Sequence, residues 1–279
     1  LVEHVAAVLG DVARGPGHGL GGIVEEVGPG VTKVSPGDHV VCSFVPACGT
    51  CRYCSTGRQS LCDMGANALS GMMPDGTFRF HGTGRDGLPE DFGGMCMLGT
   101  FSERATVSQH SVVKVDDWLP LDRVVLVGCG VPTGWGSAVY AGDVRVGDIV
   151  VIYGIGGIGI NAVQGALAAG AKHVIVVDPV EFKRDMALKF GAGYAYADPM
   201  SAHEKVTELS WGEGADTAIV TVGTVDEATV SSAIGVVGKG GTVVLVGMSS
   251  PEQFTVHWPG IDLTLNEKTI KGSLFGSAN

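Results

Sequence analysis

The sequence lacks the features that mark several large classes of protein. No apolar run approaches the roughly 18 uninterrupted residues of a membrane-spanning helix, and the N-terminus has no basic-then-apolar signal pattern. Basic residues are few, since 18 lysines and arginines face 29 acidic residues, and the longest basic cluster is Lys183-Arg184. These absences exclude a membrane protein and a phosphate-neutralising nucleic-acid binder, and we expect an acidic protein of the cytoplasm.

Glycine, by contrast, is abundant. It supplies 45 of the 279 residues, far above its usual share, but follows no collagen-like period, and hydrophobic residues still make up 45% of the chain. A chain of this length can form two ordinary domains, each with a buried core. The composition therefore predicts a globular protein with many tight turns.

The pattern of apolar residues changes along the chain. Before about residue 115, short alternating runs are separated by Pro-Gly, Gly-Asp and Gly-Thr turns, which is typical of a β-barrel or sandwich. After about residue 144, apolar runs alternate with glycine turns and helical stretches, which predicts a doubly wound parallel sheet of the Rossmann type. We expect one domain over 1–135 and a second over 136–279, with helices ending near Gly191 and Gly240. The expected strands of the second domain are 149–153, 173–177, 194–197, 217–222, 242–246 and 269–274.

Four of the seven cysteines lie within the stretch CGTCRYCSTGRQSLC, as Cys48, Cys51, Cys54 and Cys62. Repeated CxxC steps bring thiolates to one ion, and four thiolates leave no position for substrate, so the spacing predicts a structural zinc site in a reducing compartment. Two alternatives remain at this point. Four unrelated thiols are disfavoured by the spacing, and an iron–sulfur cluster is disfavoured by the missing Cys-Pro and the long last gap.

The segment VVIYGIGGIGINAVQGALAAG places Gly154, Gly156 and Gly159 directly after a predicted strand and before a predicted helix. In that context the pattern is typical of a dinucleotide-binding turn, although glycines needed for packing alone are the alternative. Nineteen residues after Gly159, the next strand ends in Asp178. A carboxylate there accepts hydrogen bonds from the adenosine ribose and repels a 2′-phosphate, so we predict NAD rather than NADP.

Together these features resemble the zinc-dependent medium-chain alcohol dehydrogenases over essentially the whole chain. The resemblance rests on GHGLGGIVEEVGPGV with SPGDHVV, on the four-cysteine stretch, on LVGCGVPTGWGSAV, on GIGGIG and on DPVEFKRDMALKFGA. The stretches MLGTFSERATV and IKGSLFGSAN are most similar to the branch called NDMA-dependent alcohol dehydrogenases. The resemblance implies a partial GroES-like β-barrel catalytic domain, with a structural zinc lobe at about 45–65, followed by a Rossmann domain.

The family resemblance also implies a second, catalytic zinc, held by an N-terminal cysteine, the histidine of a Gly-His-Glu motif and a cysteine before the coenzyme domain. His18 and Cys129 match the last two ligands. Thr133 matches a residue that packs near the nicotinamide, and His4 resembles a proton-relay histidine. Without the resemblance, His18 would be interpreted as a turn residue and Cys129 as an inert buried thiol.

For the coenzyme, the resemblance adds Lys183, which matches a residue that reaches the adenosine ribose. Ligands of open α/β sheets lie beyond the carboxyl ends of the strands, where the fourth and fifth predicted strands end. The expected coenzyme-binding residues are Gly154, Gly156, Gly157, Ile158, Gly159, Asp178, Lys183, Val222, Gly223, Val246 and Gly247. Cys42 and Cys96 match no site, and we interpret them as ordinary buried or spare thiols.

The function implied is an NAD-dependent, zinc-containing alcohol dehydrogenase that transfers hydride between an alcohol, or an aldehyde in reverse, and the coenzyme. The resemblance further suggests a homodimer or homotetramer formed through the sheet edge. Which alcohol reacts cannot be predicted, because no motif marks the substrate pocket.

Two departures from the family pattern favour an alternative. Gly19 stands where the motif has glutamate, and no cysteine precedes Cys42. The missing cysteine is explained if the chain is a fragment trimmed at both ends, and we then expect NAD binding with little turnover. The alternative is a non-catalytic NAD-binding module whose fold is stabilised by a structural zinc. A zinc-finger nucleic-acid binder explains neither GIGGIG nor the net charge of −11.

Overall fold

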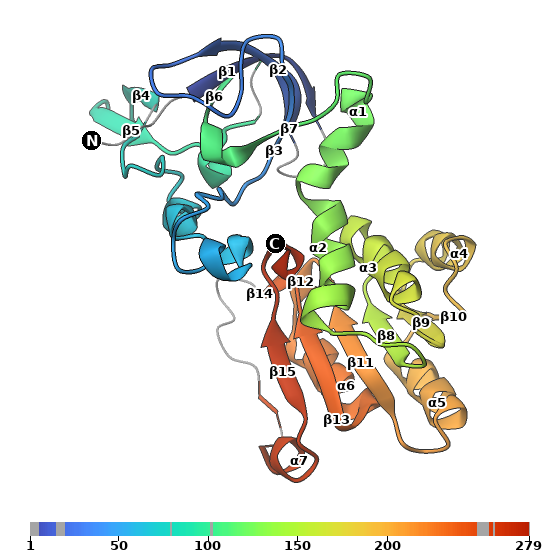
Figure 1. Ribbon diagram of the computed structural model, residues 1–279. Helices are drawn as coiled ribbons and strands as arrows, with labels where there is room; N and C mark the ends of the chain where they lie inside the picture. The colour runs from blue at the N-terminus through green and yellow to red at the C-terminus, as the bar shows by residue number, and fades with distance from the viewer. Residues whose placement is uncertain are drawn as a thin grey trace. The chain divides into compact units, whose positions relative to one another are not determined.

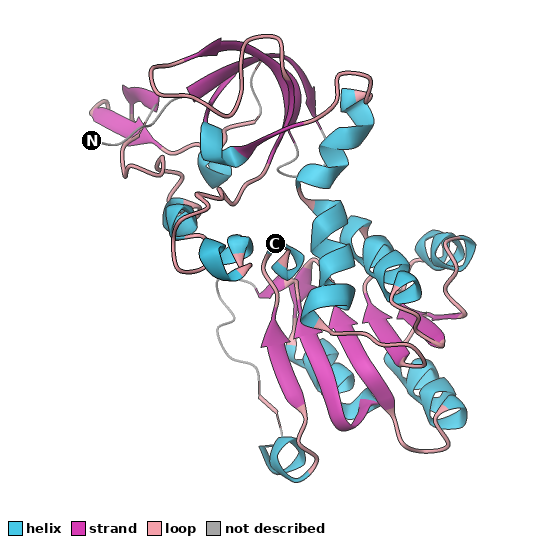
Figure 2. Ribbon diagram, in the orientation of Figure 1, coloured by secondary structure: helices cyan, strands magenta, loops and turns pink. Residues whose placement is uncertain are grey.

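The structure is a computed structural model in which the chain forms two compact units (Figures 1 and 2). It describes residues 6–14 as backbone, and residues 20–78, 80–100, 103–249, 257–258 and 260–278. The boundary between the units lies between Gly130 and Val131.

The first unit is built on a five-stranded antiparallel sheet of order β6-β1-β2-β3-β7, whose strands curve strongly (Figure 1). Its core contains Leu20, Val40 and Val107, which are completely buried, because alternate residues of the strands face inward. This sheet is the GroES-like part of the predicted fold. The strands are β1 (Ala6–Arg14), β2 (Leu20–Val27), β3 (His39–Cys42), β6 (Ala105–Ser108) and β7 (Val112–Lys114).

A long excursion between β3 and β6 carries the four cysteines and an exposed hairpin. It contains the 3₁₀ turns η1 (Cys54–Thr56), η2 (Gln59–Leu61), η3 (Asp63–Asn67) and η4 (Met95–Met97), and the hairpin of β4 (Phe80–Thr83) and β5 (Pro89–Phe92). The unit ends with η5 (Gln109–Ser111), α1 (Leu121–Val124) and η6 (Val125–Gly128).

The second unit contains a six-stranded parallel sheet of order β10-β9-β8-β11-β13-β15. The chain runs outward from β8 to β10, then returns to the centre and runs to the other edge, so the order reverses between β8 and β11. Ligands bind at such a switch point in open α/β sheets. The strands are β8 (Ile149–Tyr153), β9 (His173–Val177), β10 (Tyr194–Tyr196), β11 (Ala215–Val220), β13 (Val237–Leu245) and β15 (Thr269–Gly272).

Helices cover both faces of this sheet (Figure 2). Along β8, Val150 and Ile152 pack with the face that carries α3, while Val151 and Tyr153 pack with the face that carries α5 and α6. Burial on both faces explains why β8 is apolar without interruption. The remaining elements are α2 (Gly130–Gly136), the π-helix η7 (Ser137–Ala141), α3 (Gly157–Ala168), α4 (Glu181–Lys189), α5 (Pro199–Leu209), β12 (Thr224–Val225), α6 (Glu227–Val236), β14 (Met248–Ser249), α7 (Gly260–Leu265) and η8 (Phe275–Ser277).

The Rossmann prediction is confirmed, and the expected helix end at Gly191, which has a φ of 103°, lies just beyond α4. The expected helix end at Gly240 is wrong. Helix α6 ends at Val236, and Gly240, with a φ of 73°, lies inside β13. The register between β11 and β13 shifts at this point, so the glycine permits a bulge in a strand rather than a helix cap.

No single helix among the described residues is long and apolar enough to cross a membrane, although the bent pair 121–128 and 130–141 passes the same test of length and composition.

Candidate functional site

The glycine turn after β8 lies at the switch point, and its three glycines meet different surroundings. Gly154 has a φ of 86°, which favours glycine. A Cβ on Gly159 would lie 2.0 Å from the Gly154 carbonyl oxygen, so close packing of α3 on the turn requires glycine there. A Cβ on Gly156 would meet nothing within 4 Å. The fold itself therefore explains two of the glycines but not the third.

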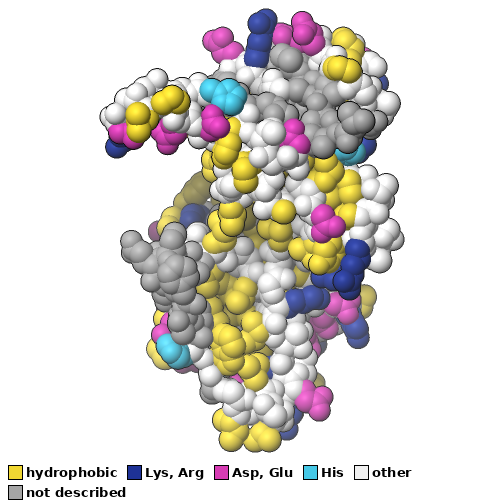
Figure 3. Space-filling view, turned by 90° about the vertical axis from the view of Figure 1, so that its left-hand side faces the viewer, with side chains coloured by type: hydrophobic (Ala, Val, Ile, Leu, Met, Phe, Trp, Pro, Cys, Tyr) yellow, Lys and Arg dark blue, Asp and Glu magenta, His cyan; other side chains and the backbone are white. Residues whose placement is uncertain are grey.

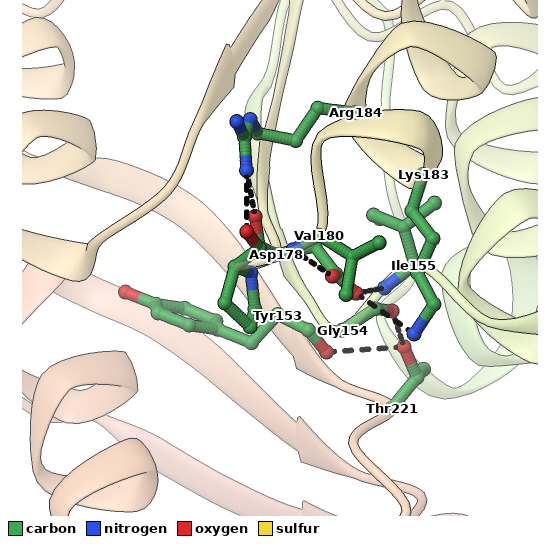
Figure 4. Close-up of polar contacts among 9 residues, drawn as sticks. Tyr153, Gly154, Ile155, Asp178, Val180, Lys183, Arg184 and Thr221 are labelled. Carbon is green, nitrogen blue, oxygen red and sulfur yellow. Dashed lines mark hydrogen bonds and ion pairs between the residues drawn. The ribbon is translucent and has the colours of Figure 1, made fainter.

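Asp178 follows β9 and closes the other side of the turn (Figure 4). Its side chain is 3% exposed, with Oδ2 accepting a 2.7 Å hydrogen bond from the backbone N–H of Ile155 and Oδ1 accepting a 2.9 Å bond from that of Val180. Lys183 Nζ lies 3.5 Å from Oδ2. Arg184 donates 2.8 Å hydrogen bonds to the carbonyls of Asp178 and Pro179. The carboxylate is thus held in one orientation at the rim of the crevice.

These groups line a pocket of about 590 Å³ at the carboxyl ends of β8, β9 and β11. Of the predicted coenzyme residues, the pocket lining includes Gly154, Gly156, Gly157, Ile158, Asp178, Lys183, Val222 and Gly223.

The other three predicted residues lie behind this lining. Gly159 packs on Gly154, Val246 donates a 3.0 Å backbone hydrogen bond to Val220, and a Cβ on Gly247 would lie 2.2 Å from the Val222 carbonyl oxygen. In this structure these three residues support the pocket lining from behind.

The pocket also contains residues that the sequence analysis did not select, among them Thr221, Thr229 and Val180. Thr221 directly precedes Val222 at a predicted strand end, which was the available signal.

A dinucleotide fits this arrangement chemically. Helix α3 begins at Gly157 after a cap at Gly156, and a Cβ on either glycine would meet nothing within 4 Å, so the space beside the helix start is open. The N–H groups of the first turn of a helix have no partner within the helix. Such a helix start attracts phosphate oxygens, because its N–H groups and dipole carry partial positive charge.

The four cysteines of the lobe converge in the first unit. Their Sγ atoms all lie within 4.8 Å of one another, with Cys48 and Cys54 3.9 Å apart and Cys51 and Cys62 4.0 Å apart. A tetrahedral zinc with bonds of about 2.3 Å places its sulfur atoms about 3.8 Å apart, which is close to the two distances above, so the cluster fits zinc. Among the residues that the structure describes, it is the one group of three or more potential ligands at such distances.

The backbone around the cluster favours thiolates. Burial raises the pKa of Cys48, but hydrogen bonds from the N–H groups of Thr50 and Cys51 outweigh it and bring the value down to about 6. The N–H of Cys54 is the main cause of the lowered pKa of Cys51. Burial raises the pKa of Cys62 to about 12, so forming this thiolate costs free energy. The positive charge of a bound dication offsets that cost.

The second predicted zinc site is described only in part, because His4 and His18 lie outside the described residues. Cys129 lies between η6 and α2, and Thr133 is buried in α2. Burial, and then the Coulomb interaction with Cys129, raise the pKa of Cys96. Cys42 is fully buried, which raises the pKa of its thiol to about 12, as expected of a core thiol.

Comparison with known proteins agrees with this geometry. Residues 8–117 match the alcohol dehydrogenase GroES-like domain, and residues 157–279 match the zinc-binding dehydrogenase family. The chain is 67% identical to the NDMA-dependent alcohol dehydrogenase of Amycolatopsis methanolica over 263 residues, which cover 94% of this chain and 70% of that protein. It is 47% identical to alcohol dehydrogenase B of Mycobacterium tuberculosis strain H37Rv, with 94% and 69% covered.

A solved structure, an alcohol dehydrogenase zinc-binding domain protein from Burkholderia ambifaria, superposes with a TM-score of 0.82 at 28% identity, covering 99% of this chain and 77% of that one. These matches confirm the predicted enzyme class, an alcohol dehydrogenase that works with zinc and NAD. The chain belongs to the zinc-dependent medium-chain alcohol dehydrogenase family.

Proposed function

We propose that the pocket at the ends of β8, β9 and β11 is where this chain holds NAD during alcohol oxidation. In this proposal the turn from Gly154 to Gly159 contacts the pyrophosphate, and Asp178 contacts the adenosine ribose. The observation that carries it is Gly156, whose missing side chain serves no contact within the protein and leaves space beside the start of α3. In the proposed complex, the pyrophosphate of the coenzyme occupies that space.

The same proposal favours NAD over NADP. The Asp178 carboxylate is buried and anchored by two backbone donors, so it cannot turn away from a 2′-phosphate without losing both hydrogen bonds. Lys183 offers a positive charge nearby, but its Nζ already lies 3.5 Å from the same carboxylate. Like charges brought together in this way cost several kcal/mol, which opposes NADP binding.

We assign the structural zinc to Cys48, Cys51, Cys54 and Cys62, and a catalytic zinc to His18 with Cys129. When bound, the catalytic ion supplies Lewis acidity that lowers the pKa of the substrate alcohol. We also assign Thr133 to pack near the nicotinamide and His4 to carry the released proton outward. The four thiolates imply a reducing compartment, and we assign the protein to the cytoplasm on that basis.

We also propose that the chain self-associates through the β15 edge of the sheet. Strand β15 pairs only with β13 among the described strands, and the hydrophobic side chains of Ile261, Leu265 and Leu274 nearby are exposed. Figure 3 shows hydrophobic side chains on the surface at its lower end, where α7 lies. Light scattering should give two or four times the chain mass of 28.6 kDa, and a monomer would contradict this assignment.

The direct test of the coenzyme proposal is a fluorescence titration of the chain with NADH and with NADPH. We expect NADH to bind at least about tenfold more tightly, because the 2′-phosphate meets the anchored carboxylate. Tighter binding of NADPH would contradict the proposal, as would no binding of either nucleotide.

A further inference from the structure

Thr221 lies in the lining of the pocket, beside the glycine turn. It follows β11, its residue is 8% exposed, and its Oγ1 lies 2.6 Å from the Gly154 carbonyl oxygen and 3.1 Å from that of Tyr153 (Figure 4). A hydroxyl has one proton to donate, and the shorter distance assigns it to Gly154. The backbone N–H of Thr221 separately donates to Tyr153 O at 2.8 Å, so the pairing of the strands does not depend on the side chain.

The hydrogen bond from Thr221 acts on the same peptide unit as Asp178. The carbonyl of Gly154 and the N–H of Ile155 belong to one planar peptide group. Thr221 holds this group by its oxygen, and Asp178 Oδ2 holds it by its N–H at 2.7 Å. A plane held at both ends has a fixed orientation, and that orientation sets the direction of the chain entering Gly156 and α3.

The carbonyl that Thr221 holds is also the one against which α3 packs. A Cβ built on Gly159 would lie 2.0 Å from the Gly154 oxygen and 2.9 Å from Thr221 Oγ1. The hydroxyl, the carbonyl and the first turn of α3 are thus in mutual contact. A small rotation of the Gly154–Ile155 peptide would move the N–H groups that face the open side of Gly156.

We propose that Thr221 is a positioning residue for coenzyme binding. Its hydroxyl fixes the Gly154–Ile155 peptide so that the N–H groups at the start of α3 face the pyrophosphate. The inference rests on the proposed function of the pocket. An apolar residue of the same shape would preserve the packing but leave the half-buried Gly154 carbonyl without this donor.

The test compares Thr221→Val, which removes the hydroxyl and keeps the shape, with Thr221→Ser, which keeps the hydroxyl. We expect Thr221→Val to raise the Kd for NADH and for ADP-ribose about tenfold, with adenosine, which lacks the pyrophosphate, bound as in the parent. Thr221→Ser should restore NADH binding to within about threefold of the parent. Thr217→Val is the matched control, because Thr217 is a buried threonine of β11, the strand that Thr221 follows, and lies outside the pocket.

Calorimetric titration and thermal melting of all four proteins separate the outcomes. Unchanged NADH binding by Thr221→Val would overturn the inference, as would a Thr221→Ser variant as weak as Thr221→Val, because packing rather than the hydroxyl would then matter. A parent chain that fails to bind NADH would overturn the proposed function itself, and this is measured before any variant is compared.

Discussion

The backbone N–H of Ile155 donates a 2.7 Å hydrogen bond to Asp178 Oδ2, joining the glycine turn after β8 to the end of β9. Because the second oxygen accepts from Val180 at 2.9 Å, the carboxylate links two loops that meet only through the fold. One side chain therefore both shapes the turn and presents negative charge at the pocket rim. A substitution there should change affinity and nucleotide preference together.

Asp178→Asn is expected to weaken NADH binding about tenfold and to narrow the preference for NADH over NADPH. The amide keeps one acceptor oxygen, so either Ile155 or Val180 loses its hydrogen bond, and the repulsion of a 2′-phosphate disappears. Fluorescence titration with both nucleotides measures the two effects. Asp185→Asn, which removes the same charge from an exposed position on α4, should change neither. An unchanged preference in Asp178→Asn would contradict the role assigned to the carboxylate.

The double variant Cys48→Ser/Cys51→Ser should lose one zinc ion per chain and melt at a lower temperature. The remaining two thiols cannot complete a tetrahedral shell, and the binding energy of a structural zinc contributes directly to folding. Elemental analysis in metal-free buffer measures the zinc content. Cys42→Ala removes a buried thiol of the barrel core and should leave the zinc content unchanged. If the double variant holds as much zinc as the parent, the lobe is not the site.

Lys268→Met should destabilise the second unit by about 1–3 kcal/mol, because it removes the donor to a buried carbonyl. The Lys268 side chain is 7% exposed, and its Nζ donates 2.9 Å hydrogen bonds to Ile234 O and Asp262 Oδ2. Urea unfolding at neutral pH measures the change. Lys239→Met, at an exposed neighbouring lysine, should have little effect, and equal stability of the two variants would contradict the prediction.

The ion pair of Lys268 with Asp262 makes the stability of the second unit depend on pH. The hydrogen bond from Lys268, followed by that from Asn266, lowers the pKa of Asp262 below its ordinary value of 3.8. A lowered folded-state pKa means that this stabilisation is complete above the unfolded value and is lost as pH falls through the folded one. Unfolding free energies from pH 6 down to pH 2 should therefore fall less steeply for Lys268→Met than for the parent. Equal slopes of unfolding free energy against pH for the two proteins would contradict a contribution of Asp262 to the pH dependence.

The parallel sheet could be predicted closely because its signals are local. Residues 149–153 and 174–177 are continuous apolar runs bounded by polar residues and glycine, and burial on both faces requires such runs. Gly240 misled the prediction, since a glycine after a helical stretch resembles a helix cap. Its purpose, a bulge where β13 shifts against β11, depends on a strand pairing that the local sequence does not encode.

The glycines and Asp178 of the candidate site could be predicted from the sequence, but Thr221 could not. A single threonine carries no periodicity, and its partner Gly154 lies far away in the chain, at a separation of 67 positions. The glycines were predictable because three of them share one short turn. Their separate roles appeared only when the space around each was known.

The central claim, that the glycine turn receives the pyrophosphate of NAD, is tested most directly by NADH titration and thermal melting of Gly156→Val. Gly156 has a φ of −91° and a ψ of −163°, which valine adopts readily, and a Cβ there meets nothing within 4 Å. We predict an unchanged melting temperature with NADH binding abolished, while Gly235→Val, at an equally open glycine of α6, keeps NADH binding. Parental NADH affinity in a folded Gly156→Val protein would contradict the account.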